Sequence, residues 1–136
     1  MRHCNQGQLR HPFLFLWATV SGDVATAEAQ LADDVEWNLM PYNHIIKGTK
    51  EVIPWLKAGV ASQKEPVVIS DLATKEWGVF ELWNIGTLTV GTIESGKQQG
   101  WPFPGDPNNL VGKKYKVPVC FVYHISAEGK IDLMRE

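Results

Sequence analysis

The sequence has few of the features that assign a chain to a class at first sight. Its 136 residues include two cysteines, Cys4 and Cys120, and no apolar run approaches the roughly 20 residues that a membrane-spanning helix needs. The 13 basic and 15 acidic residues leave a net charge of −2, which offers no footprint for nucleic acid or an anionic membrane. Two isolated cysteines are more typical of free thiols in a reducing compartment than of one disulfide. We therefore expect a soluble, cytoplasmic protein with no nucleic-acid or membrane partner.

Tryptophan is the residue type that the chain has in excess. Six Trp residues supply core volume, and large aromatic side chains also line pockets for apolar ligands. A chain of this length buries roughly two-thirds of its unfolded surface, so one domain over residues 1–136 is expected.

Hydrophobic spacing predicts helices at 12–20, 24–32 and 49–60, and strands at 35–39, 67–74, 77–90, 113–126 and 131–136. Residues 41–47 and 92–112 are predicted as loops, and the second is long enough to be a lid or a binding segment. The order is α-α-β-α-β-β-β-β, with helices first and antiparallel strands later. This order predicts an α+β domain, in which a strongly curved, cone-shaped sheet wraps the helices and encloses a pocket at its open end.

The last predicted strand carries the strongest chemical candidate. Alternation places Asp132, Met134 and Glu136 on one face. If that face is the core, burial disfavours the charged form of Glu136 and makes it usable as an acid or base near neutral pH. Two alternatives remain: these carboxylates lie on the solvated face of an edge strand, or the terminal strand frays.

Two further residues are candidates for proton transfer. His124 shares a strand face with Cys120 and Val122, and a histidine near the Glu136 carboxylate can transfer protons near neutrality. Glu81 would be a second carboxylate opposite Glu136 if its side chain points inward; otherwise it faces solvent or a partner subunit. Four residues along a strand span about 13 Å, so Cys120 and His124 cannot share a metal. No metal and no cofactor are expected.

Aromatic side chains are the candidates for the pocket wall. Trp101 and Phe103 lie between Gly100 and Gly105 in the long predicted loop, where they either form a lid over the pocket or dock on a dimer partner. For any other aromatic residue, packing in the core is the alternative reading. The predicted substrate-contacting set is Trp37, Asn38, Tyr42, Trp55, Trp83, Trp101, Phe103, Cys120, Val122 and Met134.

A series of short motifs resembles the SnoaL-like branch of the nuclear transport factor 2-like superfamily. The motifs are Ser21-Gly22-Asp23, Leu31 to Trp37, Met40-Pro41, Gly48 to Ile53, Glu128 to Ile131 and Met134 to Glu136. The resemblance covers residues 13–136 and implies a cone of sheet and helices whose mouth admits a small hydrophobic molecule. Relatives include limonene-epoxide hydrolase, ketosteroid isomerase, scytalone dehydratase and polyketide cyclases.

The resemblance also says what chemistry to expect. Glu136 matches the last-strand carboxylate of limonene-epoxide hydrolase, and Trp37 and Asn38 match its Tyr and Asn. The Arg of that enzyme would fall on residues 79–85, which contain none. Leu39 and Met40 match the Asp of ketosteroid isomerase and cannot transfer a proton. The resemblance therefore implies a cofactor-free acid/base hydrolase, dehydratase or cyclase; the alternative is a non-catalytic ligand-binding or homodimerisation module.

Overall fold

The structure is a computed structural model that describes residues 11–62, 66–98 and 100–136. Its helices are α1 (His11–Ser21), α2 (Val24–Ala29), α3 (Thr49–Ser62) and α4 (Val90–Gln98), with short 3-10 helices η1 (Met40–Tyr42) and η2 (Pro107–Leu110). Its strands are β1 (Leu31–Leu39), β2 (His44–Lys47), β3 (Val67–Ala73), β4 (Trp77–Thr87), β5 (Lys114–Ile125) and β6 (Ile131–Arg135). None of the helices in the described part of the chain is long and apolar enough to cross a membrane.

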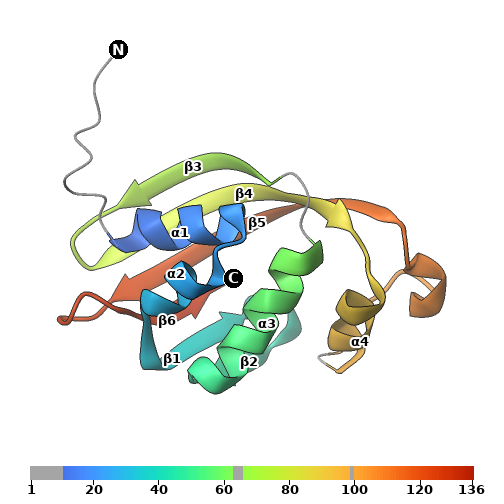
Figure 1. The fold of residues 1–136 in the computed structure, drawn as a ribbon, viewed down its shortest axis with the longest axis horizontal. Coiled ribbons are helices and arrows are strands. Elements are labelled where there is room, and N and C mark those ends of the chain that lie inside the picture. The colour runs from blue at the N-terminus through green and yellow to red at the C-terminus, as the bar shows by residue number, and fades with distance from the viewer. Residues whose placement is uncertain (1–10, 63–65, 99) are drawn as a thin grey trace, which may run out of the picture.

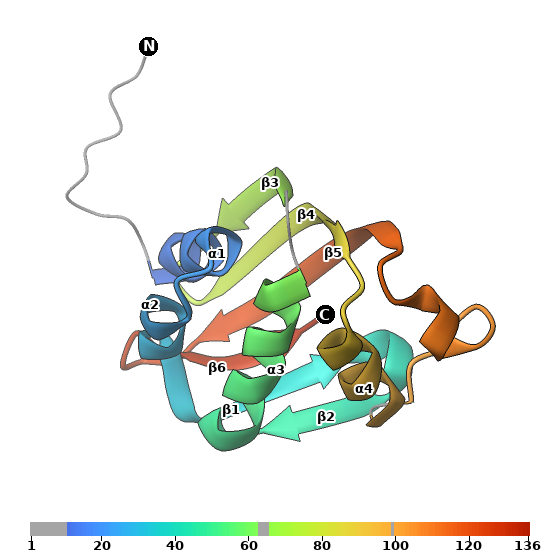
Figure 2. The same ribbon diagram turned by 45° about the vertical axis from the view of Figure 1, so that its right-hand side comes forward.

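The six strands form one curved sheet in the order β2-β1-β6-β5-β4-β3. All neighbouring pairs are antiparallel except β1 and β6, which run parallel. α1, α2 and α3 lie along one face of this sheet, and α4 lies beyond the end where β4 finishes and β5 begins (Figures 1 and 2). The predicted α+β cone is confirmed, with one strand more than expected and one parallel pairing.

The helix-to-helix turn after α1 forms where the sequence predicted it. Gly22 adopts a positive φ of 81°, a conformation that a residue without Cβ reaches without strain. The Asp23 carboxylate then accepts a hydrogen bond from the backbone N–H of Thr26 and caps α2. α2 is shorter than predicted, because Leu31 already pairs with Ile131 in the sheet.

Two elements lie where loops were predicted. β2 pairs with β1 within residues 41–47, and α4 occupies much of the first half of residues 92–112. β2 is short and carries two adjacent isoleucines rather than an alternating pattern, whereas α4 contains Gly91 and Gly96, which weaken a helical signal.

The two faces of the sheet differ in burial. On β4, Phe80 and Leu82 are buried against the helices, whereas Glu81 between them is exposed. We call the side that faces the helices the concave face and the opposite side the convex face. The core lies on the concave face, where strand residues pack against Phe15 and Leu16 of α1 and against residues of α3.

The final strand departs from simple alternation. The register shifts between the pairs His124–Leu133 and Ile125–Ile131. Ile131 and Met134 are therefore both buried, although strict alternation would put them on opposite faces. The prediction that Asp132 shares a face with Met134 was wrong, because this irregularity turns Asp132 toward the convex side, where it meets His124.

Candidate functional site

The sheet separates the predicted site residues into two groups. The members that line the concave side, or the helices and loop that cover it, are Trp37, Tyr42, Trp55, Trp101, Phe103, Met134 and Glu136. The members on the convex face are Asn38, Glu81, Trp83, Cys120, Val122 and His124. The structure thus brings together about half of the predicted set, at the open end of the cone.

His124 lies away from Glu136. Its ring packs edge-on against Trp77, with centroids 4.8 Å apart, and its Nδ1 lies 2.6 Å from a carboxylate oxygen of Asp132. Tyr123, the preceding residue, points to the concave side and pairs with Met134. His124 therefore has a carboxylate partner, but that partner is Asp132 on the convex face and not Glu136.

The other convex residues are held by local contacts as well. Glu81 accepts a hydrogen bond of 2.7 Å from the Ser70 hydroxyl, so the inward-facing alternative for Glu81 is excluded. The Lys116 ammonium lies 4.6 Å from the centre of a Trp83 ring. The Asn38 amide contacts Glu36, and Cys120 is an exposed free thiol. The second cysteine, Cys4, lies outside the described residues.

The main chain of Glu136 is fixed between two residues at the end of β1. Its N–H donates to the carbonyl of Asn38 at 2.8 Å, and its own carbonyl accepts from the N–H of Met40 at 2.9 Å. These bonds extend the parallel pairing in which Trp37 lies opposite Met134. Glu136 is therefore not a frayed end, and β6, which precedes it, lies inside the sheet between β1 and β5 (Figures 1 and 2).

The carboxyl group of Glu136 lies in a poorly hydrated place. Desolvation raises the pKa of this group to about 7 from an ordinary value of 4.5. The indole N–H of Trp37 opposes the shift by stabilising the charged form. It does so without a well-formed hydrogen bond, since Trp37 Nε1 is buried and has no partner that meets hydrogen-bond geometry. Near neutral pH this carboxyl group can therefore both donate and accept a proton.

Tyr42 adds a hydroxyl group to the same place. Burial raises the pKa of Tyr42, and the negative charge of Glu136 raises it further. The Tyr42 hydroxyl thus stays protonated at physiological pH and remains available as a hydrogen-bond donor. Tyr42 is the last residue of η1, and Asn43 after it takes a left-handed conformation and turns the chain from β1 into β2.

An aromatic cluster covers this end of the cone. The ring of Trp101 stacks on Tyr42 with centroids 5.8 Å apart and meets Trp55 edge-on at 5.4 Å. Phe103 lies next to Trp101, and both rings pack over Gly96 of α4, where a Cβ atom would lie 2.5 Å from Phe103. The segment expected to be a lid is thus packed on Tyr42, which lies near Glu136. The indole nitrogen of Trp101 is buried and has no hydrogen-bond partner among the described residues.

The concave face is not filled to its edge. Val68 and Val117 both lie on this face, opposite Leu82 and Asn84 respectively, yet each is 44 % exposed. Deeper in the cone, Phe80 on the same face is buried. Apolar surface therefore remains open on the concave face at these two positions, and exposed apolar surface of this kind can receive a small apolar molecule.

Sequence reasoning missed one polar pair in this region. The Tyr115 hydroxyl donates to the Asn84 side-chain oxygen at 3.3 Å, from β5 to β4 on the concave face. Alternation along β4 puts Phe80, Leu82 and Asn84 on one face, but the sequence does not tell which face of the strand points inward. The polar pair could therefore not be predicted. Within the described ranges, no three His, Cys, Asp or Glu side chains cluster as metal ligands would.

Comparison with known proteins rests on structure. No protein-family model matches the sequence, and no curated protein matches it. Solved structures do match. One is a nuclear transport factor 2-like protein of unknown function from Cytophaga hutchinsonii, with 17 % identity, a TM-score of 0.63, and coverage of 92 % of this chain and 93 % of that one.

Two other matches come from Mycobacterium tuberculosis. RV0760c, in complex with estradiol-17beta-hemisuccinate, has 17 % identity and a TM-score of 0.63 over 92 % of this chain and 88 % of that one. A limonene-epoxide-hydrolase-like epoxide hydrolase has 19 % identity and a TM-score of 0.62 over 93 % and 78 %. The matches also include proteins described as SnoaL-like or ketosteroid-isomerase-like. At such identities the likeness shows the fold: the chain has the α+β cone of the nuclear transport factor 2-like proteins, as its sequence predicted.

Proposed function

We propose that this protein is a cofactor-free enzyme that performs acid/base chemistry on a small hydrophobic molecule, of the hydrolase, dehydratase or cyclase type. Glu136 would transfer the proton. The observation that carries the proposal is the desolvated Glu136 carboxyl group, whose pKa is raised to about 7, in a sheet whose concave face keeps apolar side chains exposed at Val68 and Val117. His124 and Glu81 are not part of this proposal, because both lie on the convex face.

The neighbouring groups suit such chemistry. With an epoxide, protonated Glu136 would protonate the oxygen as its C–O bond breaks, and the resulting carboxylate would accept a proton from the water that bonds to the carbon. With an alcohol, the protonated hydroxyl would leave as water, and the carboxylate would accept a proton from the adjacent carbon as the double bond forms. The Tyr42 hydroxyl would hold the reacting oxygen, and Trp101 with Phe103 would restrict water above it. Within the described residues Glu136 forms no ion pair with an arginine, and in this proposal the Tyr42 hydroxyl would stabilise charge on the substrate oxygen by hydrogen bonding.

The test combines a substrate screen with one isosteric variant. Wild type and Glu136→Gln are incubated with a panel of small epoxides and polyketide-like alcohols, and products are followed by mass spectrometry. We expect turnover by wild type and a loss of about 10²-fold or more in Glu136→Gln, the usual contribution of a general acid or base. Glu81→Gln is the matched control and should retain full activity. Equal turnover by wild type and Glu136→Gln would remove the proposal.

A non-catalytic ligand-binding module is the second candidate. It is favoured by the stacked contact of Trp101 with Tyr42, because such aromatic walls hold a flat apolar ligand without any proton transfer. It predicts ligand-dependent shifts of the Trp101 and Tyr42 resonances with unchanged ligand after long incubation. Recovery of a chemically altered ligand would count against it.

A second copy of the chain is the partner we propose for the convex face. That face exposes large apolar side chains, including Leu72 at 73 % and Trp77 at 40 %, beside both acidic and basic groups, which suits pairing of identical surfaces. A Leu72→Glu variant should shift the mass measured by light scattering from dimer to monomer. We place this homodimer in the cytoplasm, where the exposed thiol of Cys120 stays reduced.

A further inference from the structure

A hollow with Trp55 in its wall lies between β2, α3 and α4, and Glu136 is not among its lining residues. It has a volume of about 490 Å³ and is formed by β2, α3 and α4. Its lining residues are His44, Ile46, Glu51, Pro54, Trp55, Ala58, Gly91, Glu94, Ser95 and Gln98. Trp55 is the one residue shared with the aromatic cluster over Glu136.

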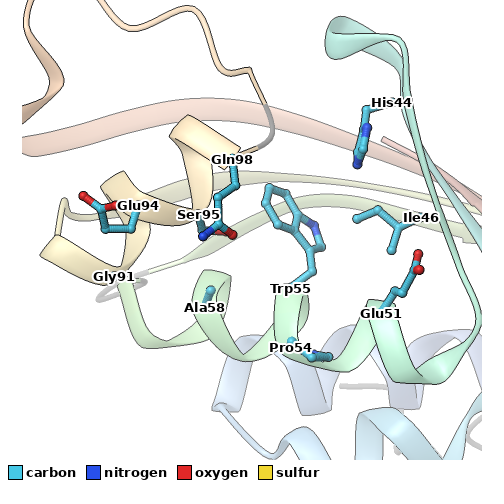
Figure 3. Close-up of a pocket in the computed structure, with 10 residues that line it drawn as sticks. All are labelled: His44, Ile46, Glu51, Pro54, Trp55, Ala58, Gly91, Glu94, Ser95 and Gln98. Carbon is cyan, nitrogen blue, oxygen red and sulfur yellow. The ribbon is translucent and has the colours of Figure 1, made fainter.

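The hollow has an aromatic centre. The indole of Trp55 stands between β2 and α4, with the His44 imidazole on one side and the Gln98 amide on the other (Figure 3). Ile46, Pro54 and Ala58 supply apolar surface around it. An indole is the side chain that attracts a cation most strongly through its ring face.

The charged groups of the lining have one sign. Glu51 and Glu94 are acidic, and the lining contains no Lys or Arg. Glu51 follows the helical spacing i, i+4 relative to Trp55, so both lie on one face of α3. The Glu51 carboxylate accepts a hydrogen bond from the backbone N–H of Lys47 and forms no ion pair within the described residues. Glu94 is partly neutralised, since Lys97 Nζ lies 3.2 Å from it.

We propose that this hollow is a binding site for a small organic cation, in which a quaternary or alkyl ammonium group lies against Trp55 and near Glu51. The volume suits a small molecule, the aromatic ring attracts the cation, and the carboxylate adds charge complementarity. The site is distinct from that of the proposed function, because Glu136 does not line it.

The experiment uses choline and its neutral analogue 3,3-dimethyl-1-butanol, in which a carbon replaces the nitrogen. Both are titrated into ¹⁵N-labelled full-length protein, and backbone and indole N–H shifts are followed by NMR. We expect saturable shifts at Trp55, Glu51 and Gln98 with choline, and binding of the neutral analogue weaker by about tenfold. Added NaCl should weaken choline binding further.

Two variants test which carboxylate contributes to choline binding. Glu51→Gln keeps the side-chain oxygen that accepts from Lys47 and should weaken choline binding about two- to fivefold. Glu94→Gln should weaken it less, because Lys97 already offsets that charge. Glu128→Gln, in the exposed turn before β6, is the matched control and should bind choline as wild type does. A native-like spectrum for each variant shows that it has folded.

Three results would contradict the proposed cation-binding site. The first is equal binding of choline and its neutral analogue, and the second is unchanged choline affinity in Glu51→Gln. The third is a pattern of shifts centred on Tyr42 and Glu136, which would place the cation in the mouth of the cone. None of these results bears on turnover in the Glu136→Gln comparison, so the two proposals fail separately.

Discussion

Two places in the fold each hold a carboxyl group close to a tyrosine. In the first, which we call the narrow end of the cone, Asp71 of β3 lies near Tyr123 of β5. In the second, which we call the mouth, Glu136 lies near Tyr42. In both pairs, burial raises the pKa of the carboxyl group, and burial together with the neighbouring negative charge raises the pKa of the tyrosine. The chemistry of the two pairs is alike, but their surroundings differ.

The two pairs differ in which member is buried more deeply. Tyr123 is fully buried in the same cluster as Phe15 and Leu16 of α1, which lies over this face of the sheet (Figure 1), whereas Asp71 is half-buried. The hydroxyl of Tyr123 and one oxygen of Asp71 have no hydrogen-bond partner in the described part of the chain. In the other pair the Glu136 carboxyl group is the desolvated member, and Tyr42 is half-buried. Burial of a carboxyl–tyrosine pair therefore does not by itself mark a site; the proposed proton transfer needs the carboxyl group itself to be desolvated.

Filling the narrow end should have the largest effect. A Cβ atom at Gly78 would overlap the ring and hydroxyl of Tyr123, and the buried ring has no room to move. We expect Gly78→Ala to lower the free energy of unfolding by about 3 kcal/mol, measured by urea denaturation. Combining it with Tyr123→Leu should cost less than the sum of the two single changes. If the two free-energy changes simply add, the close contact between Gly78 and the Tyr123 ring is contradicted.

Glu136 should make stability depend on pH. Its pKa of about 7 in the folded protein lies above the ordinary 4.5, so the unfolded chain releases this proton first. The stabilisation is full below about pH 4.5 and is lost as pH rises through 7, by roughly 3 kcal/mol. Urea midpoints between pH 4 and 8 should fall less steeply in Glu136→Gln than in wild type. Parallel curves for the two proteins would refute the raised pKa.

Gly96 tests whether the aromatic cluster depends on close packing against α4. A Cβ atom there would lie 2.5 Å from Phe103 and 2.8 Å from Trp101. Because these rings sit on a loop, they can shift, and we expect Gly96→Ala to cost about 1–2 kcal/mol and to change the near-ultraviolet circular dichroism. Gly91→Ala on the same helix meets only an ordinary contact at 3.8 Å and is the matched control. The cluster is independent of Gly96 if both variants give the same spectrum.

Asp71 should give the smallest effect. Burial raises the pKa of this carboxyl group, so its protonated form stabilises the fold at low pH, and that contribution is lost as pH rises through the raised pKa. Asp71→Asn should therefore be more stable than wild type at pH 7 by up to about 1 kcal/mol, with the difference vanishing in acid. Thermal melting at pH 3 and pH 7 measures this. A variant that is less stable at pH 7 would mean that the charge has a stabilising partner.

The sequence predicted the main elements and the acid but not the arrangement of the polar residues around it. Helical spacing and the Gly22-Asp23 pair located the first two helices, because both signals are local. Whether odd or even residues of β4 face inward is a tertiary property. Glu81 and Asn84 could therefore not be placed until the sheet was known, although they lie three residues apart on one strand.

The error at His124 has a different origin. Alternation alone put Asp132 with Glu136 and suggested that His124 reached Glu136 across the hairpin. The register shift between the pairs His124–Leu133 and Ile125–Ile131 reverses the side of Asp132, and no residue type in the turn indicates such an irregularity. Likewise, Gly96 looked like a helix breaker, whereas in the structure it is the place where Trp101 and Phe103 can approach α4.

The parallel contact of the last strand with the first ties recognition to completion of the fold. Glu136 is bonded to Asn38 and Met40, residues about a hundred positions earlier, and contacts this distant in sequence are costly to close. A partly folded chain would hold hydrophobic surface but no positioned acid. The proposed ligand binding would therefore require that β6 has already paired with β1.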